Sequence, residues 1–137
     1  MATERVATEK RVLTPTIGRL LFGLMLQQND IEHWLDRKIA NGKEDQAVSV
    51  NDWLIGQALS VYGAVREASF LLAKRCETEV AMAIENATAL LKQVIDHLKY
   101  NEQDLEEARE LYVRLMEFES DLILTVARCT GIQLFEG

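Results

Sequence analysis

Apolar residues recur with a helical period through most of the stretch from Asn51 to Tyr100. In its first half they follow one another in steps of three and four: Leu54, Ala58, Val61, Val65, Ala68, Leu72 and Cys76. This spacing places them on one stripe of a helix, and such a stripe must be buried against other elements. Because the stretch contains no proline, little in it interrupts a helix.

A second apolar stripe occupies the other half of this stretch: Val80, Ala83, Ala87, Leu91, Val94 and Leu98. At about 100° per residue, this second stripe is rotated around the helix axis by roughly 60° from the first stripe. A straight helix would also place the charged Glu79 among the apolar residues of the first stripe, which is costly. A break near Glu77 to Glu79, with Thr78 as the new N-cap, removes both conflicts. One long bent helix is the alternative, because Lys74 to Glu79 contains neither glycine nor proline.

The first helix is predicted from Pro15 to Gln28, with Thr14 as its cap and proline at the first helical position. Its apolar residues cover almost the whole circumference: Ile17, Leu20, Leu21, Phe22, Leu24, Met25 and Leu26. Such a helix is either central to the core or half of a subunit interface. It does not cross a membrane, since about 20 apolar residues are needed for a bilayer and Arg19 interrupts the run.

A short second helix is predicted from Asp30 to Ala40, capped by Asn29 or Asp30 and ended by Asn41 and Gly42. Its expected inner face holds Ile31, Trp34, Leu35 and Ile39. The one obvious loop follows, from Lys43 to Val50, and either Ser49 or Asn51 caps the next helix.

The last helix is predicted from Glu102 to Cys129, with Asn101 as its cap and Gly131 as its C-terminal cap. Asp104 supports the start, because negative charge suits the positive end of the helix dipole. The expected buried face consists of Leu105, Ala108, Leu111, Tyr112, Leu115, Leu122, Ile123 and Val126.

These patterns predict an all-α fold, a single-domain bundle of about five helices in which the two or three longest pack antiparallel. The central stretch supplies two of the helices, from Asn51 to about Cys76 and from about Thr78 to Tyr100. We expect residues 1–13 to form a flexible arm and residues 14–137 to form the domain.

Composition favours a soluble globular protein, with 48% hydrophobic and 27% charged residues among 137. The net charge of -7 argues against direct binding to nucleic acid or to an anionic membrane. Two cysteines, Cys76 and Cys129, are too few for a disulfide framework, so we expect them to be small core residues in a cytoplasmic protein.

Negative charge is concentrated between Asn101 and Asp121, where eight acids face two arginines and leave a net charge of -6. Most of these acids fall on the outer side of the last helix: Glu102, Glu106, Glu110, Glu117 and Asp121. One interpretation is an ordinary solvated face. The alternatives are a recognition surface for a basic protein and an acidic surface that imitates the phosphates of a nucleic acid.

Glu119 is unusual because it falls within the apolar face of the last helix. We expect either a salt bridge to Arg66, Lys92 or His97, or exposure at a helix crossing. A metal-binding or catalytic carboxylate in the bundle core is the alternative, although the Glu-x-x-His companions of such sites are absent from the sequence.

Two short patterns partly resemble enzyme motifs. Glu106, Glu107 and Glu110 spell E-E-x-x-E, which is similar to the first half of the magnesium-binding signature of all-α nucleotide pyrophosphohydrolases, but the second half is absent. Lys92 and His97 weakly resemble the R-x4-6-H motif of HEPN-type helical ribonucleases, with lysine in place of arginine. A histidine at a helix C-terminus is the simpler interpretation of His97.

The sequence therefore predicts no catalytic residue, no cofactor and no metal ligand, since it also lacks a phosphate-binding glycine loop and zinc-spaced cysteines. We expect a non-catalytic protein-interaction module (an adaptor, regulator or inhibitor), which forms homo-oligomers and binds a protein with a basic surface. Trp34, Trp53 and the five outer acids are its candidate interaction residues. The alternatives are a nucleic-acid mimic and a magnesium-dependent nucleotide pyrophosphohydrolase.

Overall fold

A computed structural model describes residues 13–41, 48–72 and 74–131 of the chain. Within these ranges it is all-helical and contains four helices, α2 (Pro15–Asn41), α3 (Val48–Leu72), α4 (Glu77–Tyr100) and α5 (Leu105–Thr130). No helix in the described ranges combines the length and the apolar composition that a bilayer span requires. The predicted arm lies outside the described residues except for Leu13, which packs against the core.

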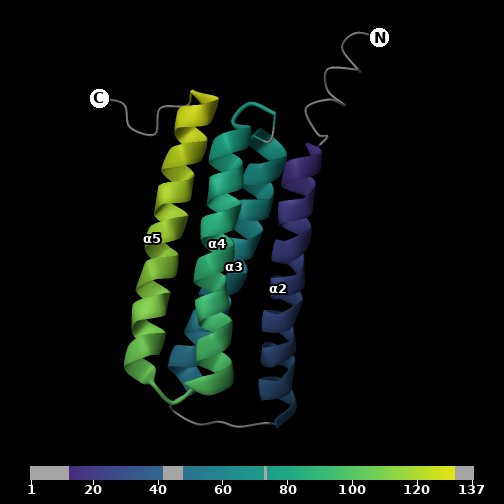
Figure 1. Ribbon diagram of the computed structural model, residues 1–137. Coiled ribbons are helices and arrows are strands. Elements are labelled where there is room, and N and C mark those ends of the chain that lie inside the picture. Colours follow the sequence, from purple (N-terminus) through teal and green to yellow (C-terminus); the bar gives the residue numbers. More distant parts are fainter. Residues whose placement is uncertain (1–12, 42–47, 73, 132–137) are drawn as a thin grey trace, which may run out of the picture.

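The four helices run along one another, down α2, up α3, down α4 and up α5 (Figure 1). Helices α3 and α4 lie between α2 and α5, which do not contact each other within the described residues. The core is formed by one apolar stripe from each helix, including Leu24 of α2, Leu54 of α3, Leu91 of α4 and Leu115 of α5.

The prediction of five helices is wrong because residues 15–41 form one helix. Asn29 and Asp30 were predicted to start a second helix, but both side chains are exposed on a continuous helix. The buried residues Ile17, Leu24 and Ile31 lie on a single stripe across this point, so a break would have gained no burial. The helix is also not central to the core.

A break in the central stretch is confirmed, but it lies before Glu77 and not at the predicted position of Glu77 to Glu79. Helix α3 ends at Leu72 and α4 begins at Glu77, so each helix turns its own stripe inward and Glu79 is exposed. The N-cap position is occupied by Cys76 and not by Thr78, and the Cys76 side chain makes no capping hydrogen bond.

The helix ends explain most of the remaining differences. Thr14 accepts a hydrogen bond from the Ile17 amide, as expected of a cap. Asp104, and not Asn101, is the N-cap of α5, because its carboxylate accepts the Glu107 N–H at 3.1 Å. Gly42 and residues 43–47 of the predicted loop lie outside the described residues, whereas residues 48–50 belong to α3.

Gly131 caps α5 as predicted, with a left-handed φ of 76° and its N–H donated to the Ala127 carbonyl. We expect Gly131→Ala to lower the free energy of unfolding by about 1 kcal/mol, because a Cβ disfavours this backbone conformation. Gly18→Ala is the control, since Gly18 lies inside α2 with open space at its Cβ position. That change should stabilise the protein by about 0.5–1 kcal/mol in urea denaturation. Equal effects of the two changes would contradict this interpretation of the cap.

Candidate functional site

A groove follows the line where α3 and α5 meet at the molecular surface. Near the C-terminal ends of both helices it has a volume of about 270 Å³ and a mainly apolar lining. Leu71 of α3 and Ile123 of α5 form its rim and are 62% and 53% exposed. Thr130 lines the same groove, which therefore reaches the last turn of α5.

The groove continues into a second hollow of about 670 Å³, lined by Phe70, Gly63 and Glu119 among others. The two hollows share Ala64, Glu67 and Leu71, so they form one surface, which we call the α3–α5 groove. Its length is suited to an extended ligand such as a helix, because it spans several turns of both helices.

Glu119 lies at the end of the α3–α5 groove that is farther from the C-terminal ends of the two helices, and it is half-buried. Its carboxylate accepts hydrogen bonds from Gln57 Nε2 and from Ser60 Oγ, the latter at 2.9 Å. Both donors are neutral, and among the described residues no cation pairs with this carboxylate. The predicted salt bridge is therefore wrong: neutral groups on α3 satisfy Glu119 and leave its negative charge in the groove.

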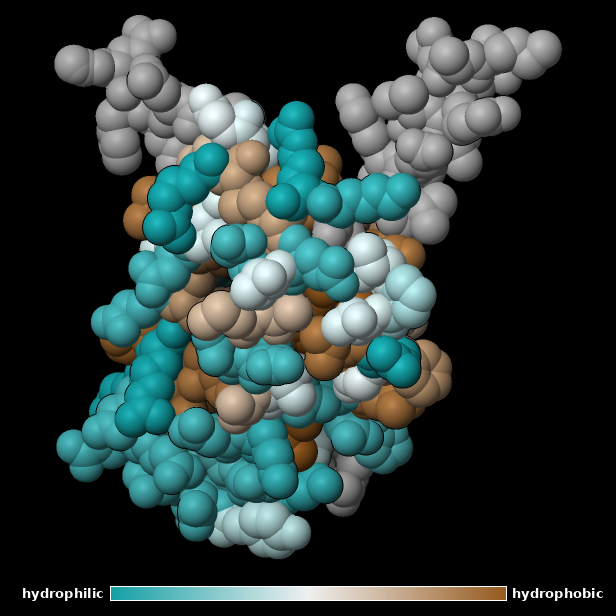
Figure 2. All heavy atoms as spheres, turned by 45° about the horizontal axis from the view of Figure 1, so that its top comes forward, coloured by the Kyte–Doolittle hydropathy of each residue, from teal (hydrophilic) through white to brown (hydrophobic). Residues whose placement is uncertain are grey.

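The outward surface of α5 carries large apolar side chains that are about half exposed: Val113, Met116, Ile123 and Leu124. Of these, Ile123 lines the groove beside α3. Ile123 was predicted to be buried, and that prediction is wrong, because the position lies at the edge of the helix face and α3 does not cover it. With the top of the bundle tilted toward the viewer, Figure 2 shows apolar side chains exposed among polar ones on this face of the molecule.

The acidic candidates lie on the outward surface of α5 as well. Glu106, Glu110, Glu117 and Asp121 are all exposed on α5, and steps of four and seven residues place them on one side of the helix. Asp121 also lines a shallow hollow between α4 and α5. Glu102 is exposed in the turn that precedes α5, so it lies beyond the end of the helix.

The two tryptophans have different surroundings. Trp53 is 64% exposed, and its spacing from Ser60 and Leu71 places it on the α5 side of α3, in line with the groove. Trp34 is half-buried and packs against the core from α2. Only Trp53 is therefore positioned beside the α3–α5 groove.

A buried polar network near the N-terminal ends of α3 and α5 is a feature that the sequence did not predict. His97 is 1% exposed, with Nε2 at 2.9 Å from Asn51 Oδ1 and Nδ1 at 2.6 Å from Glu107 Oε1. Asn51 Nδ2 donates to the Glu102 carbonyl at 2.8 Å. The network joins α3, α4 and α5. His97 therefore links three helices, in addition to its predicted interaction with the C-terminal end of α4.

Hydrogen-bond directions determine where the protons lie. Asn51 must turn its NH₂ group toward the Glu102 carbonyl, so its Oδ1 is an acceptor and His97 Nε2 is a donor. One proton then lies in the hydrogen bond between His97 Nδ1 and Glu107 Oε1. Because Glu107 is held by His97, it is drawn away from the exposed Glu106 and Glu110, and the three carboxylates of E-E-x-x-E do not form a cluster in the described structure.

At the opposite end of the bundle, Cys76, Glu79 and Cys129 come together. Both cysteines are half-buried free thiols that pack against the core, in partial agreement with the prediction of small core residues. A hydrogen bond with Cys129, followed by burial and by the negative charge of Glu79, raises the pKa of the Cys76 thiol to about 11. The sequence offered no signal for this cluster, because Cys76 and Cys129 are separated by most of α4 and α5.

Comparison of the chain with protein-family models, with curated proteins and with solved structures finds no match. Function is therefore inferred from the surfaces and side-chain clusters described above.

We expect Asn51→Ala to lower the free energy of unfolding by about 1–3 kcal/mol, because it leaves His97 Nε2 buried without a partner and removes the hydrogen bond to the Glu102 carbonyl. Urea denaturation measures the loss. Asn86→Ala, at an exposed position of α4, is the matched control and should stay within about 0.5 kcal/mol of the wild type. A loss at Asn51 no larger than at Asn86 would show that the network does not hold the helices together.

Proposed function

We propose that this protein is a non-catalytic interaction module that binds an amphipathic helix of a partner protein in the α3–α5 groove. The observation that carries the proposal is the exposure of Leu71 and Ile123 on the rim of an apolar groove. Contiguous exposed apolar surface of this kind marks protein-interaction sites, and a groove between two helices is a common receptor for a third helix.

The charge around the α3–α5 groove indicates the chemistry of the partner. Glu67 lines both hollows, Glu119 and Arg66 line the second hollow, and the exposed acids of α5 lie beyond the groove on the outward surface. A partner helix with an apolar ridge and one or more lysines or arginines would bury the ridge against Leu71 and Ile123. Its cation would then reach Glu119, whose negative charge has no cationic partner within the described structure.

Affinity should come mainly from the apolar contact, and the acidic residues should set orientation and the rate of association. Trp53 extends the surface along α3 and would anchor one end of the bound helix. We place this binding in the cytoplasm, the compartment that the two free thiols favour.

Site-specific photocrosslinking in the native host tests the proposal. We expect a photoreactive amino acid at Ala64, in the α3–α5 groove, to give one discrete adduct with a peptide that has an apolar ridge and basic residues. The same amino acid at Lys92, on the exposed surface of α4, should not give it. With the purified partner, Leu71→Ser and Ile123→Ser should each weaken binding about tenfold or more.

Met82→Ser is the matched control for these changes, because Met82 is 57% exposed on α4 and lies away from the groove. The proposal fails if the Lys92 position gives the same adduct, or if the Met82 change weakens binding as much as the groove changes. A nucleic-acid-binding partner whose affinity depends on Glu110 and Glu117 but not on Leu71 would favour the acidic mimic instead.

We further propose that α2 is the surface through which the module forms homo-oligomers. Phe22, Met25 and Leu26 are 63%, 49% and 53% exposed on its outer side. Two copies of α2 can pair antiparallel about a two-fold axis that passes between residues 24 and 25. In this arrangement Leu26 of one copy lies against Gly23 of the other, which has open space at its Cβ position. Arg19 of each copy then faces Asp30 of the other, and both side chains are exposed in the monomer.

A single helix pair buries less than the roughly 1,200 Å² of a standard stable interface, so we expect a concentration-dependent dimer. Arg19→Glu and Asp30→Arg should each weaken it about tenfold, and the double variant should restore it, because the charges are then exchanged. Sedimentation velocity over a range of protein concentrations measures these effects. Lys92→Glu, on the exposed face of α4, is the control. A double variant as weak as the single ones would rule out this pairing.

A further inference from the structure

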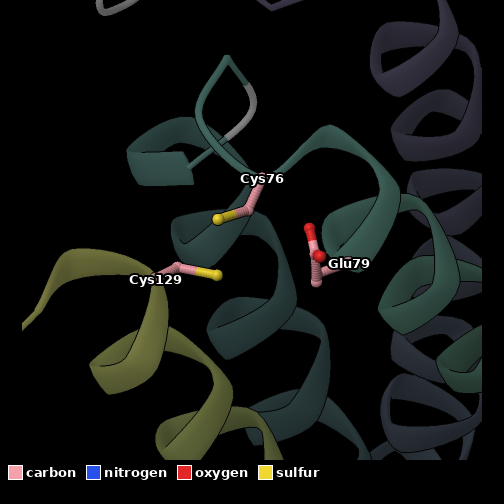
Figure 3. Close-up of side chains that lie close together, drawn as sticks. All are labelled: Cys76, Glu79 and Cys129. Atoms are coloured by element: carbon pink, nitrogen blue, oxygen red, sulfur yellow. The ribbon is translucent and has the colours of Figure 1, made fainter.

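Two thiols and a carboxylate converge at the end of the bundle opposite the His97 network. Cys76 precedes α4, Glu79 lies in its first turn, and Cys129 lies in the last turn of α5. Their ligand atoms all lie within 4.8 Å of one another. Figure 3 shows the two sulfur atoms facing each other, with the Glu79 carboxylate beside them.

We propose that Cys76, Glu79 and Cys129 form a binding site for a thiolate-preferring divalent cation of the zinc class. Tetrahedral zinc, with bonds of about 2.3 Å to sulfur and about 2.0–2.2 Å to oxygen, holds such atoms roughly 3.4–3.8 Å apart. The three side chains already approach this separation, so small rotations bring them into contact with one ion. A water molecule would complete the four-coordinate shell.

The side chain of Cys76 supports a role in binding. It occupies the N-cap position of α4, where serine, threonine, aspartate or asparagine normally accepts a backbone hydrogen bond, yet it makes no such bond. It is directed instead toward Cys129 on another helix. The Glu79 side chain is exposed and long enough to adjust, and both cysteines are only half-buried, so a cation from solvent has access.

The ligand set selects the kind of cation. Two thiolates favour zinc over magnesium or calcium, which prefer shells made only of oxygen. A disulfide between Cys76 and Cys129 is the competing interpretation of the two sulfur atoms, but a disulfide would give no role to the nearby Glu79 carboxylate. The presence of Glu79 within the same 4.8 Å therefore favours the cation.

A bound ion would connect the C-terminal turn of α5 to the start of α4. Thr130, which lines the α3–α5 groove, is the next residue after Cys129, so the ion would also fix the upper end of that groove. This consequence rests on the proposed binding function, whereas the metal site itself does not.

Cobalt titration of the reduced full-length chain tests the site, since tetrahedral cobalt thiolates absorb in the near ultraviolet and the visible. We expect one equivalent of Co²⁺ to produce these bands and one equivalent of Zn²⁺ to remove them. Saturating zinc should also raise the melting temperature by about 5–10 °C, because the ion binds only the folded arrangement of the three ligands.

Cys129→Ser should abolish the two-thiolate spectrum, and Glu79→Gln should weaken cobalt binding at least about tenfold. Glu85→Gln, at an exposed position two turns further along α4, is the matched control and should bind cobalt as the wild type does. Circular dichroism establishes that each variant is folded before it is titrated.

The proposal is overturned if the folded wild type shows no charge-transfer bands, or if Glu79→Gln and Glu85→Gln bind cobalt equally. It is also overturned if the chain isolated from the host under thiol-trapping conditions has lost two hydrogens by mass and contains no metal, since the cysteines then form a disulfide. Normal cobalt binding by the Leu71→Ser variant would show that the metal site does not depend on the proposed helix-binding groove.

Discussion

The arrangement of the helices around the α3 and α4 pair is the constraint on which the rest of the structure depends. Within the described residues, helices α2 and α5 pack on this pair but not on each other, so each covers the core with one face and keeps a wide outward surface. Both outward surfaces carry large apolar side chains, such as Phe22 and Ile123, that the fold does not bury. Exposed apolar surface of this extent is costly in water, and binding to a partner would remove that cost.

The two ends of the bundle are held by different chemistry. At one end, Asn51, His97 and Glu107 join three helices through buried hydrogen bonds, which are costly to leave incomplete and therefore favour one packing arrangement. At the other end, Cys76 and Cys129 bring α4 and α5 together through side chains that also suit a metal ion. Between these ends lies the α3–α5 groove, whose lining combines apolar side chains with a few polar ones, among them Glu67, Arg66 and Glu119.

The sequence was sufficient to predict the structural features that depend on a periodic apolar pattern or on the residues at a helix end. The all-helical fold, a break in the central stretch and the Gly131 cap followed from stripes and caps that each lie within one or two turns. The division of residues 15–41 did not, because Asn29 and Asp30 can cap a helix but are equally tolerated on its exposed side.

The candidate sites were harder to predict, because they depend on which helices are neighbours. His97 and Asn51 are far apart in the sequence, and only the packing of α3 against α4 places them within hydrogen-bond distance. The same holds for Cys76 and Cys129. Ile123 falls on the edge of a helical stripe, where periodicity does not decide between burial and exposure. The exposed acids of α5 were identified correctly as exposed, since charge alone predicts that property.

The accessibility of the groove in the free protein tests the central claim most directly. Methyl-labelled nuclear magnetic resonance with a soluble paramagnetic agent measures it in the monomer. The account predicts strong relaxation of the Leu71 and Ile123 methyl groups and weak relaxation of the Ile84 methyl groups, which are fully buried in the core. Protection of Ile123 equal to that of Ile84 would contradict the account, because the groove would then be closed and could not receive a partner helix.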